Sequence, residues 1–374
     1  MVSLDEEQTY ASVITVIGTR PEIIKVAPVA KVCAEMGVRN EIVHTGQHYS
    51  YEMDSLMFND LNLPVPKYNL RIGSGTHAEE TARALLGLEG LFKKLMPRLV
   101  LVQGDTNSTL AGALAASKLH IPVGHIEAGL RSFDRGMPEE KNRVLTDHIS
   151  DLLFAPTETS AKNLANEGIP STRILITGNT IVEAVSVGLR LIEARLREGA
   201  NEEIVDDDFM LLTLHREENV DREDRLKKII KGVSLAASKS GKKIIFPAHP
   251  RTVKRIRQYA VSIPDSVVVT NPLGYLDFLR LERDADLILT DSGGVQEEAC
   301  ILKVPCVTLR RSTERPETVE IGANRLAGLE PENIVSGVEM MMNSSRHWTN
   351  PFGDGRAGTR IVETIVANGW SRVE

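Results

Sequence analysis

The sequence predicts a two-domain α/β protein in which each domain contains a mostly parallel β-sheet, and three observations lead to this prediction. The chain has 374 residues, which is more than one hydrophobic core usually holds. Short runs rich in Val, Ile and Leu alternate with longer helical patterns, as in parallel strands joined by crossover helices. Strands such as residues 285–289 are apolar almost throughout, which is typical of strands covered on both faces.

Two series of strands are expected, in chain order. The first comprises residues 12–17, 39–44, 98–103, 122–126, 152–155 and 174–177, and the second 209–214, 243–246, 266–269, 286–290 and 306–309. Between them, a helix-like stretch at 184–208 ends in an acidic run, which is typical of a solvated linker. We therefore expect an N-terminal domain at 1–183 and a C-terminal domain at 184–355, with a final helix within 356–374 that joins the first domain.

Composition and charge exclude several classes of protein. The chain is 42% hydrophobic and 25% charged, like an ordinary globular protein, and its net charge of -7 argues against a nucleic-acid partner. Residues 1–10 do not resemble a signal peptide, and no apolar run approaches the roughly 20 residues that span a bilayer. Cys33, Cys300 and Cys306 lack C-x-x-C spacing, so neither a disulfide framework nor a zinc site is expected. A cytoplasmic location fits these features.

Polar clusters follow the expected strands in both halves of the chain. Ligands of open parallel sheets bind outside the carboxyl ends of the strands, so two such sheets facing each other would line one cleft from both sides. The clusters are Gly18-Thr19-Arg20-Pro21-Glu22, Thr45-Gly46-Gln47-His48, Gly104-Asp105-Thr106, Glu127-Ala128-Gly129, His215-Arg216-Glu217-Glu218-Asn219, His249-Pro250-Arg251, Asp291-Ser292-Gly293-Gly294 and residues 310–317.

The segment Asp291-Ser292-Gly293-Gly294 follows a strand and opens a helix. Free backbone N–H groups and the helix dipole favour an anion there, and glycines let a phosphate approach closely. The alternative is a tight turn that needs glycine for its geometry alone. Arg310, Arg311 and Arg315 lie nearby in sequence, and this basic cluster favours a phosphate site.

The segment after the first strand follows the same logic. Pro21 suits the beginning of a helix, and Arg20 is of the residue type that binds phosphate in a bidentate manner. Lys25 lies five residues further on, where it either reaches the mouth of the cleft or remains a solvated helix residue.

Asp105, Glu127 and Glu139 lie in or near loops that follow strands, and His215 lies in such a loop of the second half. Carboxylates and a histidine around one cleft suit acid–base chemistry. Individually each acid is more often a helix cap, Asp105 for a helix that begins near Thr106. Glu139 lies in a segment that is either a lid or a surface turn.

The other histidines near the expected strands are not predicted to be catalytic residues or metal ligands. His125 precedes Glu127 on the strand, and alternation turns it away from its immediate neighbours, so we interpret it as a core histidine with satisfied hydrogen bonds. His44 and His48 have a metal-like spacing, but no third ligand pattern accompanies them, and no metal is expected. The chain has neither a P-loop nor a strand-borne G-x-G-x-x-G, so neither ATP hydrolysis nor a nicotinamide cofactor is indicated.

These ordered motifs resemble those of the non-hydrolysing UDP-N-acetylglucosamine 2-epimerases, from about Ser12 to the end of the chain. The matching segments are Gly18-Thr19-Arg20-Pro21-Glu22-Ile23-Ile24-Lys25, Gln103-Gly104-Asp105-Thr106, His125-Ile126-Glu127-Ala128-Gly129-Leu130-Arg131, Pro138-Glu139-Glu140-Lys141-Asn142-Arg143, Pro156-Thr157-Glu158-Thr159, Gly178-Asn179-Thr180, His215-Arg216-Glu217-Glu218-Asn219, Asp291-Ser292-Gly293-Gly294-Val295-Gln296-Glu297-Glu298 and Thr313-Glu314-Arg315-Pro316-Glu317.

The resemblance implies a GT-B type fold, with two Rossmann-like doubly wound domains facing across a cleft, and a homodimer. It implies reversible C2 epimerisation of a UDP-sugar substrate, UDP-N-acetylglucosamine, to UDP-N-acetylmannosamine without a cofactor. UDP would be eliminated to leave 2-acetamidoglucal and then added back. Domain closure would shield that glycal from water.

The resemblance also assigns roles to residues at matching positions. It implies that Asp105, Glu127, Glu139, His215, Arg20 and Lys25 form the catalytic set. Substrate binding is implied for Arg20, Lys25, His215, Ser292, Gly293, Gly294, Glu298 and Arg315, with a glutamate on the ribose hydroxyls. Which carboxylate removes the C2 proton stays open.

A regulatory site is a weaker expectation. Many bacterial members have a second glutamine near position 50 that helps to bind a regulatory UDP-N-acetylglucosamine, whereas this chain reads Tyr49-Ser50-Tyr51. Gln47, His48 and Arg71 remain as candidates for such a site. The chain also has Glu217 and Cys300 where many relatives have a basic residue and a proline.

Several other functions share these motifs. The nearest are a hydrolysing epimerase and an epimerase for a modified UDP-sugar such as a diacetamido uronic acid. A GT-B glycosyltransferase would transfer the sugar to an acceptor. A non-catalytic sugar-nucleotide sensor would require loss of the acids, and Asp105, Glu127 and Glu139 are present. The pathway, envelope polysaccharide or glycoprotein sugar, is not indicated.

Overall fold

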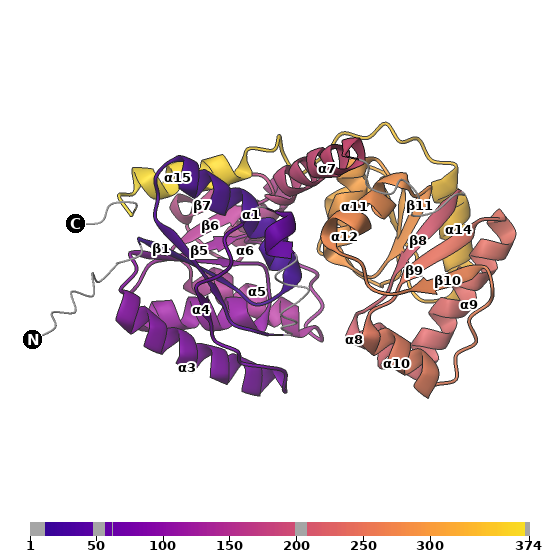
Figure 1. Cartoon of the computed structure of the whole chain (residues 1–374), viewed down its shortest axis with the longest axis horizontal. Coiled ribbons are helices and arrows are strands. Elements are labelled where there is room, and N and C mark those ends of the chain that lie inside the picture. The colour runs from indigo at the N-terminus through magenta and orange to yellow at the C-terminus, as the bar shows by residue number, and fades with distance from the viewer. Residues whose placement is uncertain (1–11, 48–56, 62, 199–207, 371–374) are drawn as a thin grey trace, which may run out of the picture. The chain divides into compact units, whose positions relative to one another are not determined.

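The computed structural model describes residues 12–47, 57–61, 63–198 and 208–370. The chain divides into two compact units, Met1–Ala184 with Gly353–Glu374 and Val185–Phe352 (Figure 1). Both are α/β units built on a parallel sheet, as the sequence predicts.

The described part of the first unit contains a seven-stranded sheet of order β3-β2-β1-β4-β5-β6-β7, with all neighbouring strands parallel. Its strands are β1 (Val13–Ile17), β2 (Asn40–His44), β3 (Tyr68–Asn69), β4 (Leu99–Gln103), β5 (Val123–Ile126), β6 (Leu152–Ala155) and β7 (Ile174–Ile176). Its helices are α1 (Arg20–Glu35), α3 (His77–Leu95), α4 (Asn107–Lys118), α5 (Pro138–Ile149), α6 (Glu158–Asn166), the 3₁₀ turn η1 (Ser171–Arg173) and α15 (Ala357–Ala367).

Alternation along the strands builds the two apolar layers of the first unit. Ile14 and Val16 of β1 pack towards α3 and α4, whereas Val13 packs with residues of α1 and α15. Figure 1 shows these helix pairs on opposite faces of the sheet. Successive side chains of a strand point to opposite faces, so the apolar runs bury both. Helix α15 packs beside α1.

The second unit repeats this plan. Its described residues form a six-stranded parallel sheet of order β10-β9-β8-β11-β12-β13. Its strands are β8 (Phe209–Thr213), β9 (Lys243–Pro247), β10 (Val267–Thr270), β11 (Leu287–Thr290), β12 (Cys306–Thr308) and β13 (Asn324–Leu326). Its helices are α7 (Ile181–Arg197), in which the division between the units falls, α8 (Glu217–Val220), α9 (Glu223–Ser240), α10 (Pro250–Gln258), α11 (Tyr275–Asp284), α12 (Gly293–Leu302), α13 (Pro316–Glu320) and α14 (Pro331–Met342).

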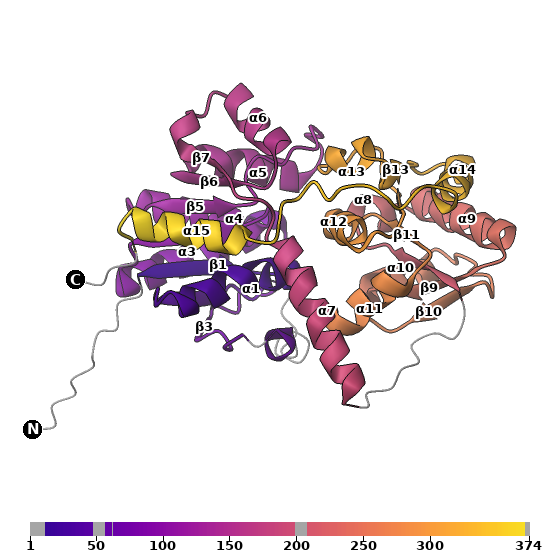
Figure 2. The same cartoon turned by 90° about the horizontal axis from the view of Figure 1, so that it is seen from above.

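Helices again cover both faces of the second sheet. Met210 and Leu212 of β8 lie in one core with residues of α9, α10 and α14, and Phe209 and Leu211 lie in another with residues of α11 and α12. Helices α9 and α14 lie side by side (Figure 2). No helix in the described part of the chain is long and apolar enough to cross a membrane.

Candidate functional site

The carboxyl ends of three neighbouring strands of the first unit carry the predicted catalytic residues. Strands β1, β4 and β5 are adjacent in the sheet, and Arg20, Asp105 and Glu127 follow their respective ends. Parallel strands end at the same edge of a sheet. The fold therefore places the loops of these three residues next to one another.

Glu127 is the centre of a buried polar group. Lys25 Nζ forms an ion pair with Glu127 Oε1, and both side chains are almost fully buried. Gln103 Nε2 donates to Glu127 Oε2 at 2.6 Å, and Asn179 Nδ2 donates to Oε1 at 3.4 Å. Glu127 has a φ of 74°, in the left-handed region that a side chain rarely adopts. The alternative that Lys25 is a solvated helix residue is wrong.

Asp105 is held by Arg143 of α5. Arg143 Nη2 lies 2.6 Å from Asp105 Oδ2, and its Nη1 lies 2.6 Å from Glu140 Oε2. The Asp105 side chain is 29% exposed, so its carboxylate reaches solvent while its partner is buried. The interpretation of Asp105 as a helix cap is wrong, because Thr106 is the N-cap of α4 and accepts from Thr109 N–H.

Glu22 joins the loops that follow β1 and β4. Its Oε2 accepts from the N–H groups of Gly18 and Thr19 at 2.7 and 2.6 Å. Its Oε1 accepts from Thr106 Oγ1 at 2.8 Å. Burial raises the pKa of Glu22 above its ordinary value, while the hydrogen bonds from Gly18 N–H and Thr106 act in the opposite direction. Glu22 thus fixes the backbone beside Arg20 and Asp105.

Arg20 and Glu139 lie at the beginnings of helices. Arg20 is the first residue of α1 and Glu139 the second of α5, and both are half-buried. The expectation that Glu139 lies in a lid or a surface turn is wrong, because Pro138 begins the helix one residue earlier. An acidic residue in the first turn interacts favourably with the helix dipole.

In the second unit, buried Asp291 organises the loop that carries His215. The N–H groups of His215 and Arg216 donate to the Asp291 carboxylate at 3.1 and 3.0 Å, and Asn219 Nδ2 donates at 3.1 Å. The His215 side chain is 48% exposed, with Nδ1 3.5 Å from Asp291 Oδ1. His215 therefore presents its ring to solvent from a fixed backbone.

Ser292, Gly293 and Gly294 form the beginning of α12. Ser292 is the N-cap, and its Oγ accepts from Val295 N–H at 3.5 Å. A Cβ on Gly293 would lie 2.6 Å from Glu314 Oε1, whereas a Cβ on Gly294 would meet only Ser292 Oγ at 4.0 Å. Gly293 is therefore required by the close approach of Glu314, and Gly294 leaves the helix N-terminus open. Such an end is suited to an anion.

The expected basic cluster near α12 is largely neutralised. Arg315 pairs with Glu297, and Arg310 Nη2 lies 2.8 Å from Glu314 Oε2. Both arginines are buried, whereas Arg311 is exposed. Arg310 and Arg315 therefore reinforce the loop beside Gly293. Because Glu297 neutralises the charge of Arg315, this arginine offers little net positive charge to a phosphate.

Glu298 lies on the buried side of α12 and interacts with a second carboxyl group, Glu282 of α11. Burial, followed by the charge of Glu298 and a hydrogen bond with it, raises the pKa of Glu282 well above its usual range. Burial and the charges of both glutamates raise the pKa of the neighbouring Tyr275 phenol.

Of the candidate regulatory residues, Gln47 follows β2 and Arg71 follows β3. Gln47 Nε2 donates to Glu80 at 3.0 Å, and its Oε1 accepts from Ser108 at 2.8 Å. Arg71 is exposed, with a φ of 51°. His48 lies outside the described residues. Gln47 is thus engaged within the first unit.

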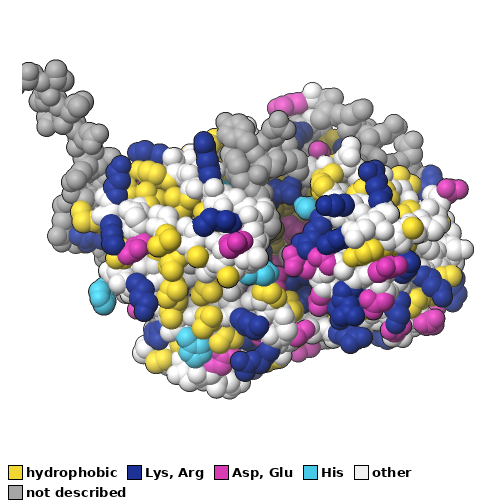
Figure 3. All heavy atoms as spheres, turned by 90° about the horizontal axis from the view of Figure 1, so that it is seen from below, with side chains coloured by type: hydrophobic (Ala, Val, Ile, Leu, Met, Phe, Trp, Pro, Cys, Tyr) yellow, Lys and Arg dark blue, Asp and Glu magenta, His cyan; other side chains and the backbone are white. Residues whose placement is uncertain are grey.

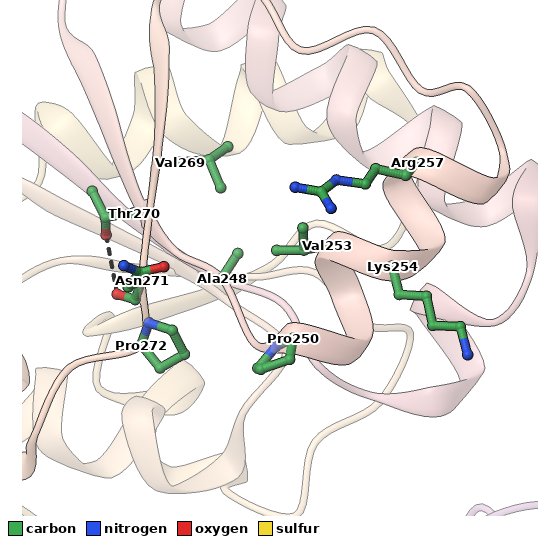
Figure 4. Close-up of a pocket in the computed structure, with 9 residues that line it drawn as sticks. All are labelled: Ala248, Pro250, Val253, Lys254, Arg257, Val269, Thr270, Asn271 and Pro272. Atoms are coloured by element: carbon green, nitrogen blue, oxygen red, sulfur yellow. Dashed lines mark hydrogen bonds between the residues drawn. The ribbon is translucent and has the colours of Figure 1, made fainter.

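A cavity of about 890 Å³ opens in the second unit at the carboxyl ends of β9 and β10. Figure 4 shows Arg257 and Val253 of α10 turned towards Val269 of β10 across it. It contains no predicted site residue. Its lining is Ala248, Pro250, Val253, Lys254, Arg257, Val269, Thr270, Asn271 and Pro272. Among the residues that the structure describes, no group of three or more His, Cys, Asp or Glu side chains could hold a metal ion.

The sequence model of the UDP-N-acetylglucosamine 2-epimerase family matches residues 30–366. The chain belongs to this family. The family membership that the ordered motifs predict is thereby confirmed.

Individual relatives of this epimerase are similar along nearly the whole chain. The UDP-N-acetylglucosamine 2-epimerase of Methanocaldococcus jannaschii is 54% identical over 357 residues, which cover 94% of this chain and 98% of the relative. The UDP-2,3-diacetamido-2,3-dideoxy-D-glucuronate 2-epimerase of Pseudomonas aeruginosa is 42% identical over 358 residues, with coverage of 95% and 99%.

A solved structure confirms the fold of the epimerase. The crystal structure of the M. jannaschii UDP-GlcNAc 2-epimerase in complex with UDP-GlcNAc and UDP matches with a TM-score of 0.90 and 53% identity. The match covers 95% of this chain and 99% of that one. The expected GT-B type of fold, with two Rossmann-like units, is confirmed.

Three residues of the epimerase that contact its carboxylates have no role in the sequence prediction, although each lies in a matching motif. Gln103 and Asn179 contact Glu127, and Arg143 contacts Asp105. Gln103 could have been found, because a polar residue at the carboxyl end of an apolar strand is a candidate ligand group. Arg143 and Asn179 carry no comparable signal, since their partners are 38 and 52 positions away.

Proposed function

We propose that this chain catalyses the reversible C2 epimerisation of UDP-N-acetylglucosamine to UDP-N-acetylmannosamine. The observation that carries the proposal is the pair of carboxylates, Asp105 and Glu127, which follow the neighbouring strands β4 and β5 and are each held by a cation. Proton exchange on both faces of one carbon needs more than one acid–base group. The 54% identical relative named for this activity supports the same substrate.

The proposed reaction has two steps. A carboxylate of the first unit removes the C2 proton while the C1–O bond breaks and UDP leaves with the bonding electron pair, giving the C1=C2 double bond of 2-acetamidoglucal. UDP then adds back to C1 as a proton is delivered to C2 from the other face. Asp105, Glu127 and Glu139 are the candidate acid–base groups, and Lys25 holds the charge of Glu127.

We propose that the second unit binds the UDP moiety. The open N-terminus of α12 at Ser292 and Gly294 suits the diphosphate, and the exposed ring of His215 adds a donor. Arg20 of the first unit supplies a further cation for the charge that develops on the leaving UDP. Glu298 would accept the ribose hydroxyls, with Glu282 beside it.

A second candidate is the same reaction on a modified UDP-sugar. The 42% identical P. aeruginosa relative is named as an epimerase of a diacetamido uronic acid. Such a substrate keeps UDP and the C2 proton, so the same carboxylates would serve. The two candidates differ in the substituents at C3 and C6.

The deciding experiment is a proton NMR time course in deuterated water with UDP-N-acetylglucosamine as the sole substrate. UDP-N-acetylmannosamine with deuterium at C2 is the expected product. Free N-acetylmannosamine and UDP would instead indicate a hydrolysing epimerase. An unchanged, unlabelled substrate would refute the proposal, and the diacetamido uronate would then be tested in the same way.

We also propose that the chain forms a homodimer through an apolar face of its first unit. Helices α3, α4 and α5 pack side by side. Leu86 of α3, its C-cap residue Met96 and Leu145 of α5 are 69%, 55% and 52% exposed. Figure 3 shows hydrophobic side chains gathered on this side of the first unit. Exposed apolar patches often mark interfaces.

Sedimentation velocity tests the dimer. Leu86→Lys with Leu145→Lys is expected to give a monomer, whereas Leu235→Lys on α9, where the leucine is 46% exposed, should leave a dimer. A wild-type monomer at micromolar concentration contradicts the proposal.

A further inference from the structure

His125 is a fully buried histidine of β5 whose two ring nitrogens both have partners. Nδ1 lies 2.6 Å from Asp147 Oδ1, and neither side chain is exposed. Nε2 lies 2.8 Å from the carbonyl oxygen of Gly104. The interpretation of His125 as a core histidine with satisfied hydrogen bonds is confirmed, but its partners carry further information.

The partners fix the protonation of the ring. A carbonyl oxygen only accepts, so Nε2 carries a hydrogen. Asp147 Oδ2 accepts from Arg131 Nη1 at 2.7 Å and from Gly129 N–H at 3.1 Å, which favours an ionised carboxylate. Nδ1 therefore also carries a hydrogen, and the ring is a cation.

The surrounding charges balance this cation. Arg131 Nη2 also lies 2.7 Å from Glu167 Oε2, so two buried cations meet two carboxylates. His148, which is 45% exposed, lies 3.4 Å from the same Glu167. A buried charge is tolerated when it is paired and hydrogen-bonded.

The ion pair holds two loops at once. His125 binds the carbonyl of Gly104, which precedes Asp105 and has a φ of 74°. Asp147 binds the N–H of Gly129, two residues after Glu127. A Cβ on Gly129 would lie 2.3 Å from the carbonyl oxygen of Ser160, so the loop packs closely against the backbone of α6 at this point.

We infer that His125 is an imidazolium at neutral pH and that its ion pair with Asp147 is a positioning device, which sets the loops of Asp105 and Glu127 relative to each other. The functional half of this inference rests on the proposed function, in which those carboxylates are the acid–base groups. The charge state of the ring does not rest on it. His125 and Asp147 are positioning residues that act through Gly104 and Gly129.

The first test is nitrogen-15 NMR of the full chain with labelled histidine at pH 7. The His125 signals are assigned by their absence in His125→Gln. Both ring nitrogens are expected to be protonated. A ring nitrogen of His125 that lacks a proton at pH 7 overturns the ion pair, whatever reaction the enzyme catalyses.

The second test separates positioning from folding. His125→Gln retains donor and acceptor atoms but no charge, and is expected to lower kcat about 100-fold because small misplacements of reacting groups are costly. The KM and the Kd for UDP are expected to change less than about threefold, since most of the proposed UDP groups (Ser292, Gly294, His215 and Glu298) lie in the other unit. A merely structural defect would instead lower both the fraction of the protein that binds UDP and the kcat calculated from total protein.

Two further variants keep the test decisive. His148→Gln, next to Asp147 on α5 but half-exposed, should retain wild-type kcat. If His125→Gln does not fold, His125→Gln with Asp147→Asn removes both charges together, which buried pairs tolerate better than loss of one. This double variant should bind UDP and remain slow. Wild-type kcat in any folded His125 variant overturns the positioning role.

If the wild-type enzyme epimerises no UDP-sugar, the proposed function fails. The ring-nitrogen spectrum still decides the ion pair in that case, so the two failures are distinguishable.

Discussion

Lys25 Nζ and Glu127 Oε1 form a buried ion pair that joins the second turn of α1 to the loop after β5. The two residues are 102 positions apart. Gln103 binds the other carboxylate oxygen, so the Glu127 carboxylate is ionised, oriented and shielded at the same time. This combination suits a group that must exchange a proton without water.

The pair predicts a non-additive mutant cycle. Lys25→Met and Glu127→Gln should each destabilise the first unit by about 3–5 kcal/mol, because each leaves a buried charge unpaired. The double variant should recover most of that loss. Its turnover should stay at least about 100-fold below wild type, because the acid–base group is gone. Urea unfolding and the NMR assay measure the two quantities. Additive destabilisation would show that the pair is not coupled.

Much of this arrangement could be predicted from the sequence, because apolar strands and the polar residues that follow them are local patterns. The strand that ends at Gln103 and the helix that begins near Arg20 illustrate this. The edge strands β3 and β13 were missed, since they have two and three residues and little apolar character. The contacts of Arg143 and Asn179 were also missed, because the packing of separate helices and loops sets them.

A second prediction concerns Asp105 and its partner Arg143. Asp105→Asn should lose most turnover but retain UDP affinity, because it leaves the proposed diphosphate contacts unchanged. Arg143→Lys keeps the charge but cannot bond Asp105 and Glu140 through two separate nitrogens as Arg143 does. We expect kcat about 100-fold lower with UDP affinity within about twofold.

Steady-state kinetics and calorimetric UDP binding measure these changes. Arg190→Lys on α7, where the arginine is exposed, is the matched control and should behave as wild type. Unchanged turnover in Asp105→Asn would remove Asp105 from the mechanism, and unchanged turnover in Arg143→Lys would make the arginine a purely structural residue.

A third prediction concerns Gly293. Its Cβ would lie 2.6 Å from Glu314 Oε1, and Glu314 cannot easily retreat because Arg216 and Arg310 bind it. Gly293→Ala should therefore displace the N-terminus of α12 and weaken UDP binding at least about tenfold, or about 1.4 kcal/mol.

Gly90→Ala is the control for this change, because a Cβ at Gly90 in α3 would meet no heavy atom within 4 Å. That variant should keep UDP affinity and gain about 0.5–1 kcal/mol of stability, since alanine favours a helix over glycine. Titration calorimetry with UDP compares the two. Wild-type affinity in Gly293→Ala would contradict the proposed diphosphate site at α12.

The fourth prediction is a pH dependence of stability that depends on His44. Burial lowers the pKa of His44 from 6.5 to about 4, and its Nδ1 accepts from Gly46 N–H at 2.9 Å, which requires a neutral ring. As the pH falls below 6.5, the His44 ring takes up a proton in the unfolded chain but stays neutral in the folded chain until the pH approaches 4. The stabilisation is therefore complete above pH 6.5 and is lost as the pH falls towards 4.

His44→Asn isolates the effect, because the asparagine Oδ1 can accept the same N–H but does not titrate. The stability advantage of the wild type over this variant should shrink by about 2.5 kcal/mol between pH 7.5 and 4.5. Trp370 packs against the core of the first unit, and Trp348 lies in the second. Urea unfolding followed by Trp370 fluorescence in a Trp348→Phe background thus reports the first unit. A constant difference across this range would mean that the folded state accepts a proton on His44, against the burial of its ring.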